Sequence, residues 1–272
     1  MEHRMSALLL CCAAAASGLA VGQNESEVDA AIESEVAARA LAMEMAALLG
    51  DSPAFAVDMN IGYDTMQEDG QKVEFGERRT VSLQRPSQVR NELLSSDGTQ
   101  ETIVFDGKSI TVSEAGSNVY ARTAQPGDID TTVKYFLGQL GMRLPLAAML
   151  MQHFPDELAR RMVDVQFVEE TDILGENAYH LAGRTSSVDF QVWISTGEQP
   201  IPYRIILTYR NSPGQPQFRA NFQNWNFKPD FAPGTFSFKP PASATEIPLI
   251  AHLVSGTTGE AATTTSMTGE TP

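Results

Sequence analysis

A run of strand patterns separated by turn signals constrains the fold of this 272-residue chain more than any other feature. The run contains four strand candidates, which are Lys72–Gln84, Val89–Leu94, Thr102–Phe105 and Ile110–Val112. Each candidate ends at a turn signal that contains proline or glycine, such as Asp97-Gly98. Consecutive strands joined by tight turns form an antiparallel meander, which can curl into a barrel or a half-barrel.

The rest of the chain adds further strands and two helical regions to this meander. The further strand candidates are Phe55–Tyr63, Asn118–Ala124, Val163–Glu169, Glu176–Arg184, Ser187–Ser195, Ile201–Arg210, Gln217–Lys228 and Phe236–Phe238. Apolar residues recur at helical spacing in Asn24–Gly50 and in several short pieces of Asp128–Met162. The sequence therefore predicts an α+β fold, in which an incomplete antiparallel β-barrel of about eleven strands, a half-barrel, is covered by lid helices.

The first helical region, Asn24–Gly50, has features of both helix ends. Asn24 or Ser26 can cap its start, and Gly50 fits a stop at its end. An apolar stripe along it comprises Val28, Ile32, Val36 and Met43, and it continues through Leu41, Met45 and Leu48. We expect this helix to pack on the sheet.

Several strands carry apolar residues at every second position, so one face of the sheet is expected to be apolar. A large exposed apolar face is not tolerated in a soluble domain, and the helices must therefore cover it. The pattern leaves open whether the covered space is an ordinary dry core or a ligand cavity. The residues predicted to line a hydrophobic, ligand-binding cavity are Phe55, Val57, Met59, Ile61, Phe75, Leu83, Phe190, Val192, Ile205, Leu207 and Phe222.

Two charged residues interrupt the apolar face of the second strand. Glu77 and Arg79 alternate with Phe75 and Val81, so a regular pleat points them toward the covered side. They are either an inward ion pair near a ligand or the sign of a bulge near Gly76 that shifts the pleat. Because unpaired charges avoid cores, the sequence favours the bulge.

The two ends of the chain differ from its middle. Residues 1–20 have the pattern of a secretory signal peptide, with Arg4 before an apolar run and small residues before the expected cleavage site. Both cysteines, Cys11 and Cys12, lie in that run, so the mature chain is expected to contain no disulfide and no thiolate metal site. Residues 254–272 are rich in Gly, Thr, Ser and Ala and are predicted to be a disordered tail. A single domain, residues 24–248, remains.

The composition and the missing motifs exclude several classes of function. A net charge of −15 repels phosphate backbones, so we expect no nucleic-acid partner. Neither a nucleophile elbow nor a phosphate-binding or dinucleotide-binding loop occurs. His153 and His180 have no neighbour at metal-ligand spacing, and we expect no metal, no cofactor and no catalytic residue. The mature protein is expected to be soluble rather than membrane-spanning, and its oligomeric state is left open.

Several short motifs give the chain a resemblance to a known superfamily. The run Val81–Asn91, which contains Arg85-Pro86, resembles the strand, Arg-Pro, strand segment of the periplasmic lipoprotein carriers of the Lol pathway, LolA and LolB. Phe105-Asp-Gly-Lys108 resembles the hairpin that follows in those carriers, and Phe236–Pro241 resembles their closing strand. The order of signal, helix, strands, helices and strands is also similar over Asn24–Ile247.

Within that superfamily, the chain is most similar to an uncharacterised family of predicted periplasmic proteins with a domain of unknown function. The motifs that carry this similarity are Arg85-Pro86, Tyr120-Ala121, Pro145-Leu146, His180-Leu181, Gln191–Ile194 and Pro202–Arg204. The central helical residues, Pro126–Met162, match no carrier motif.

The resemblance implies a LolA-like half-barrel with helical lids over a hydrophobic cavity that takes acyl chains, in a protein of the periplasm. It also implies that Arg85 is a lid latch, because the corresponding arginine of the carriers donates hydrogen bonds to lid carbonyl groups. The function expected from it is non-catalytic binding of a lipid or a lipidated protein, as in envelope lipid or lipoprotein transport. The alternative is an envelope assembly or protein-interaction module whose packed core holds no ligand.

Overall fold

The predicted meander is present in the computed structural model of the protein, which describes residues 17–139 and 144–249. Its strands are β2 Lys72–Gln84, β3 Gln88–Ser95, β4 Gln100–Phe105 and β5 Ser109–Glu114. Glycines at positive φ make two of the turns, Gly98 at 90° and Gly107 at 85°. The preceding aspartates complete these turns, because Asp97 and Asp106 accept hydrogen bonds from the backbone amides that follow.

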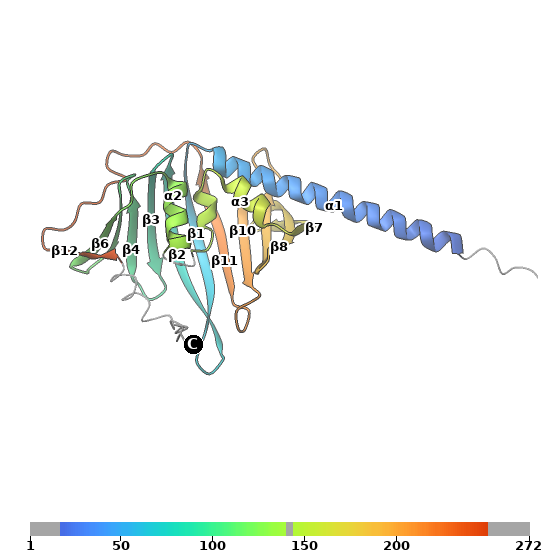
Figure 1. The fold of residues 1–272 in the computed structure, drawn as a ribbon, viewed down its shortest axis with the longest axis horizontal. Helices are drawn as coiled ribbons and strands as arrows, with labels where there is room; N and C mark the ends of the chain where they lie inside the picture. The colour runs from blue at the N-terminus through green and yellow to red at the C-terminus, as the bar shows by residue number, and fades with distance from the viewer. Residues whose placement is uncertain (1–16, 140–143, 250–272) are drawn as a thin grey trace, which may run out of the picture.

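All twelve strands belong to one sheet, whose order is β12-β6-β5-β4-β3-β2-β1-β11-β10-β9-β8-β7 (Figure 1). The other strands are β1 Ala54–Met66, β6 Val119–Ala124, β7 Asp164–Ile173, β8 Glu176–Arg184, β9 Val188–Ser195, β10 Pro202–Tyr209, β11 Gln217–Asn226 and β12 Thr245–Pro248. In the sheet as described, β7 and β12 are its two edges, so the sheet is open. The α+β half-barrel predicted from the sequence is confirmed.

The last strand differs from the prediction in place and in direction. Phe236 ends a turn and Phe238 lies in irregular structure. β12 lies further on and pairs with β6 in parallel, so the sheet is mixed. The two phenylalanines pack against other rings instead: Phe236 lies 4.9 Å from Phe231 between centroids, and Phe238 lies 5.4 Å from Tyr120. Their alternation therefore reflects aromatic packing over the sheet edge and not a strand.

The first helix, α1 Ser17–Asp51, is longer than predicted and lies beside the sheet with its N-terminal part extending past β7 (Figure 1). Its buried face consists of small and long residues at helical spacing, which are Ala38, Ala42, Met45, Ala46 and Leu49. The predicted stripe is wrong for Ile32 and Val36, which are 55% and 64% exposed. The helix uses alanines to approach its neighbours closely, and its bulkier residues near Ile32 lie beyond the sheet.

The covering helices of the middle region are confirmed as short pieces. They are α2 Ile129–Lys134, the π-helix η1 Tyr135–Gln139, the 3₁₀-helix η2 Ala147–Leu150 and α3 Phe154–Arg161. We call residues 129–151, of which 140–143 are outside the described part, the lid segment. Asp128 caps α2, since its side chain accepts a hydrogen bond from the backbone amide of Thr131.

One continuous core joins the inner face of the sheet, which is the face toward the helices, to α1, α3 and the lid segment. Leu49, Phe55, Leu83, Ile110, Leu181 and Ile194 are its most deeply buried large side chains. Among the helices of the described residues, none is both long and apolar enough to cross a membrane. The predicted tail and the first sixteen residues of the predicted signal peptide lie outside the described part of the chain.

Candidate functional site

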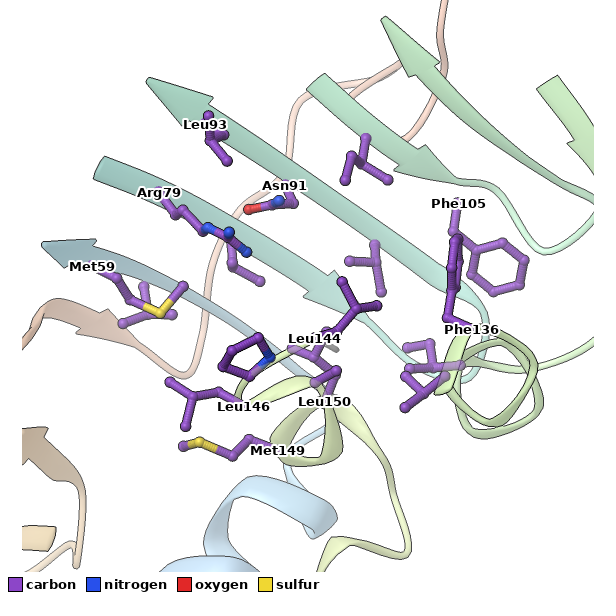
Figure 2. A pocket seen from close by; sticks show the side chains of 18 of the residues that line it. Met59, Arg79, Asn91, Leu93, Phe105, Phe136, Leu144, Leu146, Met149 and Leu150 are labelled. Atoms are coloured by element: carbon purple, nitrogen blue, oxygen red, sulfur yellow. The ribbon is translucent and has the colours of Figure 1, made fainter. Parts of the chain in front are cut away.

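The inner face of strands β1–β5 and β11, the end of α1 and the lid segment line a partly open cavity of about 270 Å³. Figure 2 shows side chains of the sheet and of the lid segment facing one another across it. The lid side is formed by Ile129, Thr132, Val133, Phe136, Leu144, Leu146, Met149 and Leu150, with Pro145 and Ala147. The volume is close to the lower end of the ~300–1,000 Å³ typical of ligand pockets, so the cavity has room for a small ligand or part of one hydrocarbon chain.

The strand register sorts the sheet side of the cavity region into rows. The row nearest the lid segment is Phe55, Leu83, Val89, Phe105 and Ile110. The second row is Val57, Val81, Asn91, Ile103 and Val112, and the third is Met59, Arg79, Leu93 and Glu101. The floor is thus entirely apolar beside the lid and becomes polar with distance from it, as the labelled Arg79 and Asn91 show (Figure 2).

Arg85 follows β2 directly and joins the sheet to both covering elements. Its Nη1 donates to the carbonyl oxygen of Leu150 at 2.8 Å, and Nη2 donates to those of Leu49 at 2.9 Å and Met151 at 3.3 Å. Its Nε donates to the carbonyl oxygen of Ser52 at 3.0 Å. The hydrogen bonds predicted for Arg85 toward the middle region are therefore present, together with bonds to the end of α1 that the sequence did not indicate. Whether they act as a latch stays a prediction.

Asp130 of α2 forms hydrogen bonds with the residues that precede α3. Its carboxylate accepts hydrogen bonds from the backbone amides of Gln152 at 2.7 Å and His153 at 3.0 Å, and it lies 2.8 Å from His153 Nδ1. Burial by itself raises the pKa of Asp130, but the hydrogen bonds from Gln152 and His153 outweigh it, so the pKa lies below its usual value. Asp130 stays ionised near Arg85, whose own pKa is lowered by burial.

Glu77 and Arg79 form the inward ion pair, and the bulge favoured from the sequence is wrong. The register of β1 with β2 runs without a shift past Gly76. Arg79 Nε lies 2.5 Å from Glu77 Oε1, and the Glu77 side chain is only 6% exposed. The core tolerates these charges because they neutralise each other, and Arg79 lines the cavity.

Five of the eleven residues predicted for the cavity line it, and these are Phe55, Val57, Met59, Ile61 and Phe222. Leu83, Val192, Ile205, Phe190 and Leu207 are in the same continuous core but outside the lining. Phe75 is 41% exposed and stacks on Tyr63 near the far end of β2. The cavity therefore lies under one half of the sheet, whereas the predicted residues were spread over both halves.

The contribution of β3–β5 to the cavity was not predicted from the sequence. Val89, Leu93, Ile103, Phe105, Ile110 and Val112 alternate within strands that were predicted correctly, and that alternation is the signal that assigns them to the inner face. On the lid side, Ile129, Val133 and Phe136 lie in the helical spacing predicted for this region. The residues of η2 had no such signal, because η2 is too short for a helical period and follows Leu146, whose φ is 65°.

His153 and His180, the histidines in the described part of the chain, do not belong to a metal site. No group of three metal-ligating side chains occurs within residues 17–139 and 144–249. His180 lies on the outer face of the sheet, where it stacks on Trp193 at 4.1 Å between centroids and its Nε2 lies 3.0 Å from Gln191 Oε1. His180 therefore packs against its neighbours on the face of the sheet opposite to the cavity.

The sequence of the chain matches the sequence model of a known protein family. The sequence model of the family described as "Predicted periplasmic protein (DUF2092)" matches residues 38–250. No curated protein matches the chain.

Similar solved structures include MucB in the MucA/MucB complex of Pseudomonas aeruginosa, at 16% identity and a TM-score of 0.42 over 77% of this chain and 63% of that chain. The chain thus spans less than two thirds of MucB. Another is the lipoprotein LppX of Mycobacterium tuberculosis, at 14% identity and a TM-score of 0.42 over 70% of this chain and 96% of that chain. A third is a LolA superfamily protein of Nitrosomonas europaea, at 12% identity and a TM-score of 0.36 over 74% of this chain and 97% of that chain.

Proposed function

We propose a lipid-binding function for this chain, which belongs to the family of predicted periplasmic proteins (DUF2092). In this proposal the protein is non-catalytic and holds the acyl part of a lipid, or of a lipidated protein, in the cavity between β1–β5 and the lid segment. It reaches the periplasm through the signal peptide predicted at residues 1–20. The observation that carries the proposal is the cavity itself, because most of its lining residues are aliphatic or aromatic.

Burial of hydrocarbon drives binding in such a site, at about 25 cal/mol for each Å² of apolar surface removed from water. The lid segment and Leu49 of α1 form the wall opposite the sheet, and in this proposal they exclude water from the bound chain. Because the cavity holds only about 270 Å³, movement of the lid makes room for a complete lipid in this proposal. Arg85 is the proposed latch of that movement, since it binds carbonyl groups at the ends of both covering elements.

Filling the cavity should abolish binding of an apolar probe. Ile103 lies in the second row of the cavity floor and is half-buried, so a tryptophan there occupies the space that a ligand needs. We expect the neutral fluorophore N-phenyl-1-naphthylamine to bind the wild-type protein at one site, and Ile103→Trp to weaken that binding by about tenfold or more. Fluorescence titration measures both affinities.

The matched control is Ile206→Trp, which places the same side chain on the outer face of β10, where Ile206 pairs with Gln191 and Arg219. Its affinity for the probe should equal that of the wild-type protein, and circular dichroism should show that both variants are folded. Equal affinities in Ile103→Trp and wild type would place the probe elsewhere. A wild-type protein that binds no probe would contradict the proposed function and favour a packed interaction module.

A further inference from the structure

The strand β7 is one edge of the described sheet, and it combines exposed apolar side chains with an excess of negative charge. We propose that this edge is a docking site for another protein, which adds an extended segment of basic and apolar residues to the sheet as one further strand. The proposal goes beyond lipid binding and is independent of it, because no residue of β7–β10 lines the cavity.

Exposed apolar side chains are concentrated at β7. Seven large apolar side chains of the described residues are exposed, and four of them lie on β7 or directly beside it. They are Val163 before the strand, Phe167 and Val168 within it, and Leu174 in the turn that follows, with exposed fractions between 40% and 62%. Single exposed apolar side chains are common on soluble proteins, whereas a group of them along one edge indicates an interaction surface.

The backbone of β7 is open to a further strand. Among the described strands, β7 pairs only with β8, so alternate residues along it direct their amide and carbonyl groups away from the sheet. The register with β8 shifts between Phe167 and Glu169, and from Glu169 to Ile173 it runs without a shift. We call Glu169–Ile173 the regular edge. Main-chain hydrogen bonds to such an edge supply the affinity when an extended peptide is added to a sheet.

The charge of β7 determines which kind of segment fits beside it. The strand carries four carboxylates and neither lysine nor arginine. Two of the carboxylates have a basic neighbour, since Asp164 interacts with Arg184 and Glu169 Oε1 lies 3.6 Å from His180 Nδ1. These two carboxylates therefore contribute less to the negative potential of the edge than the other two.

Glu170 and Asp172 are the other two carboxylates, and both lie on the regular edge. Their cross-strand partners on β8 are Tyr179 and Asn177, which are uncharged. Within residues 17–139 and 144–249, neither carboxylate has an ion-pair partner. The two side chains are two residues apart on one strand, so they face the same side. Lysine or arginine at the facing positions of an added strand would form cross-strand pairs of opposite charge with them.

The same charges disfavour a second copy of this chain as the occupant. Antiparallel pairing of two β7 edges places the carboxylates of both copies beside one another, and like charges in cross-strand pairs are destabilising. The register shift after Phe167 adds to this effect, because bulges and charged side chains on edge strands prevent edge-to-edge association. A basic segment avoids the repulsion, so the occupant that fits is a segment of another protein.

A synthetic peptide of about ten residues, in which lysine and valine alternate, is the probe for this edge. We expect it to slow hydrogen exchange at the amides of Glu169–Ile173 that face away from β8, by about tenfold or more at saturation, as measured by NMR. A peptide with glutamate in place of lysine should leave the exchange unchanged. So should a lysine–valine peptide that is methylated at its backbone amides, because it keeps the charge but cannot donate hydrogen bonds.

Glu170→Lys combined with Asp172→Lys reverses the charge of the regular edge. This double variant should bind the lysine–valine peptide about tenfold or more weakly than the wild-type protein, as measured by fluorescence anisotropy of a labelled peptide. The matched control is Glu68→Lys combined with Asp230→Lys, which changes the net charge equally at two exposed positions outside β7 and β8. It should keep the wild-type affinity, and circular dichroism should show that both double variants are folded.

Equal binding of the lysine and glutamate peptides, or an equal loss of affinity in the two double variants, would overturn the proposal, and so would unchanged exchange in Glu169–Ile173. Protection of these amides that rises with protein concentration, without any peptide, would assign the edge to a second copy and overturn it as well. None of these outcomes bears on the cavity, which the fluorophore titration tests separately.

Discussion

Ile205→Asp is expected to lower the free energy of unfolding by more than about 3 kcal/mol, because it places an unpaired carboxylate in a core position. Ile205 lies on the inner face of β10 and is buried between its register partners Ala220 on β11 and Val192 on β9, which are also buried. All three belong to the continuous core. Urea unfolding followed by circular dichroism measures the loss.

Thr208→Asp is the matched control on the same strand, with the opposite parity. Thr208 is partly exposed, and its hydroxyl accepts a hydrogen bond from Gln217 Nε2 that an aspartate can also accept. We expect this variant to lose less than about 1 kcal/mol. Equal losses in the two variants would mean that both faces of β10 are buried, and the half-barrel would then have no distinct outer face.

Arg85→Leu is expected to speed hydrogen exchange in the lid segment and at the end of α1 together, by a factor that corresponds to roughly 1–3 kcal/mol of opening free energy. The guanidinium binds the carbonyl oxygens of Leu150 and Met151 in the middle region and of Leu49 and Ser52 at the end of α1. Leucine leaves these carbonyl groups without their donor. Hydrogen exchange read by mass spectrometry covers both peptides.

Arg78→Leu controls for the loss of one positive charge on the same strand, since Arg78 is exposed on the outer face. Its exchange rates in both peptides should match those of the wild-type protein. Unchanged protection in a folded Arg85→Leu variant would remove the latch from the account and leave Arg85 as a structural residue. Faster exchange at the end of α1 alone would assign Arg85 to the anchoring of that helix.

The strands were largely predictable, because the alternation of apolar residues and the turn residues that indicate them are close together in the sequence. β2 and β8 begin and end at the predicted residues. β12 was missed because four residues paired in parallel with a distant strand have no local signature. The family was also predictable from short motifs such as Arg85-Pro86, and the match over residues 38–250 confirms it.

The cavity was less predictable than the sheet, because alternation tells which face a residue occupies but not what lies above it. Ile61 and Ile205 share the inner face, yet only Ile61 lines the cavity. The Glu77–Arg79 pair shows the same limit, since the general avoidance of buried charge pointed to a bulge, whereas the two side chains neutralise each other. The two side chains point inward because β2 pairs with β1 without a shift, and this register depends on the whole sheet.

The mass of the intact protein under non-denaturing conditions, after gentle purification, shows whether the cavity holds a lipid. We predict that the wild-type chain carries one lipid that dissociates on denaturation, and that Ile103→Trp, purified in the same way, carries none. If the wild-type protein has the mass of the bare chain, and stays bare after incubation with vesicles of phosphatidylethanolamine and phosphatidylglycerol, the cavity does not bind lipid and the account is contradicted.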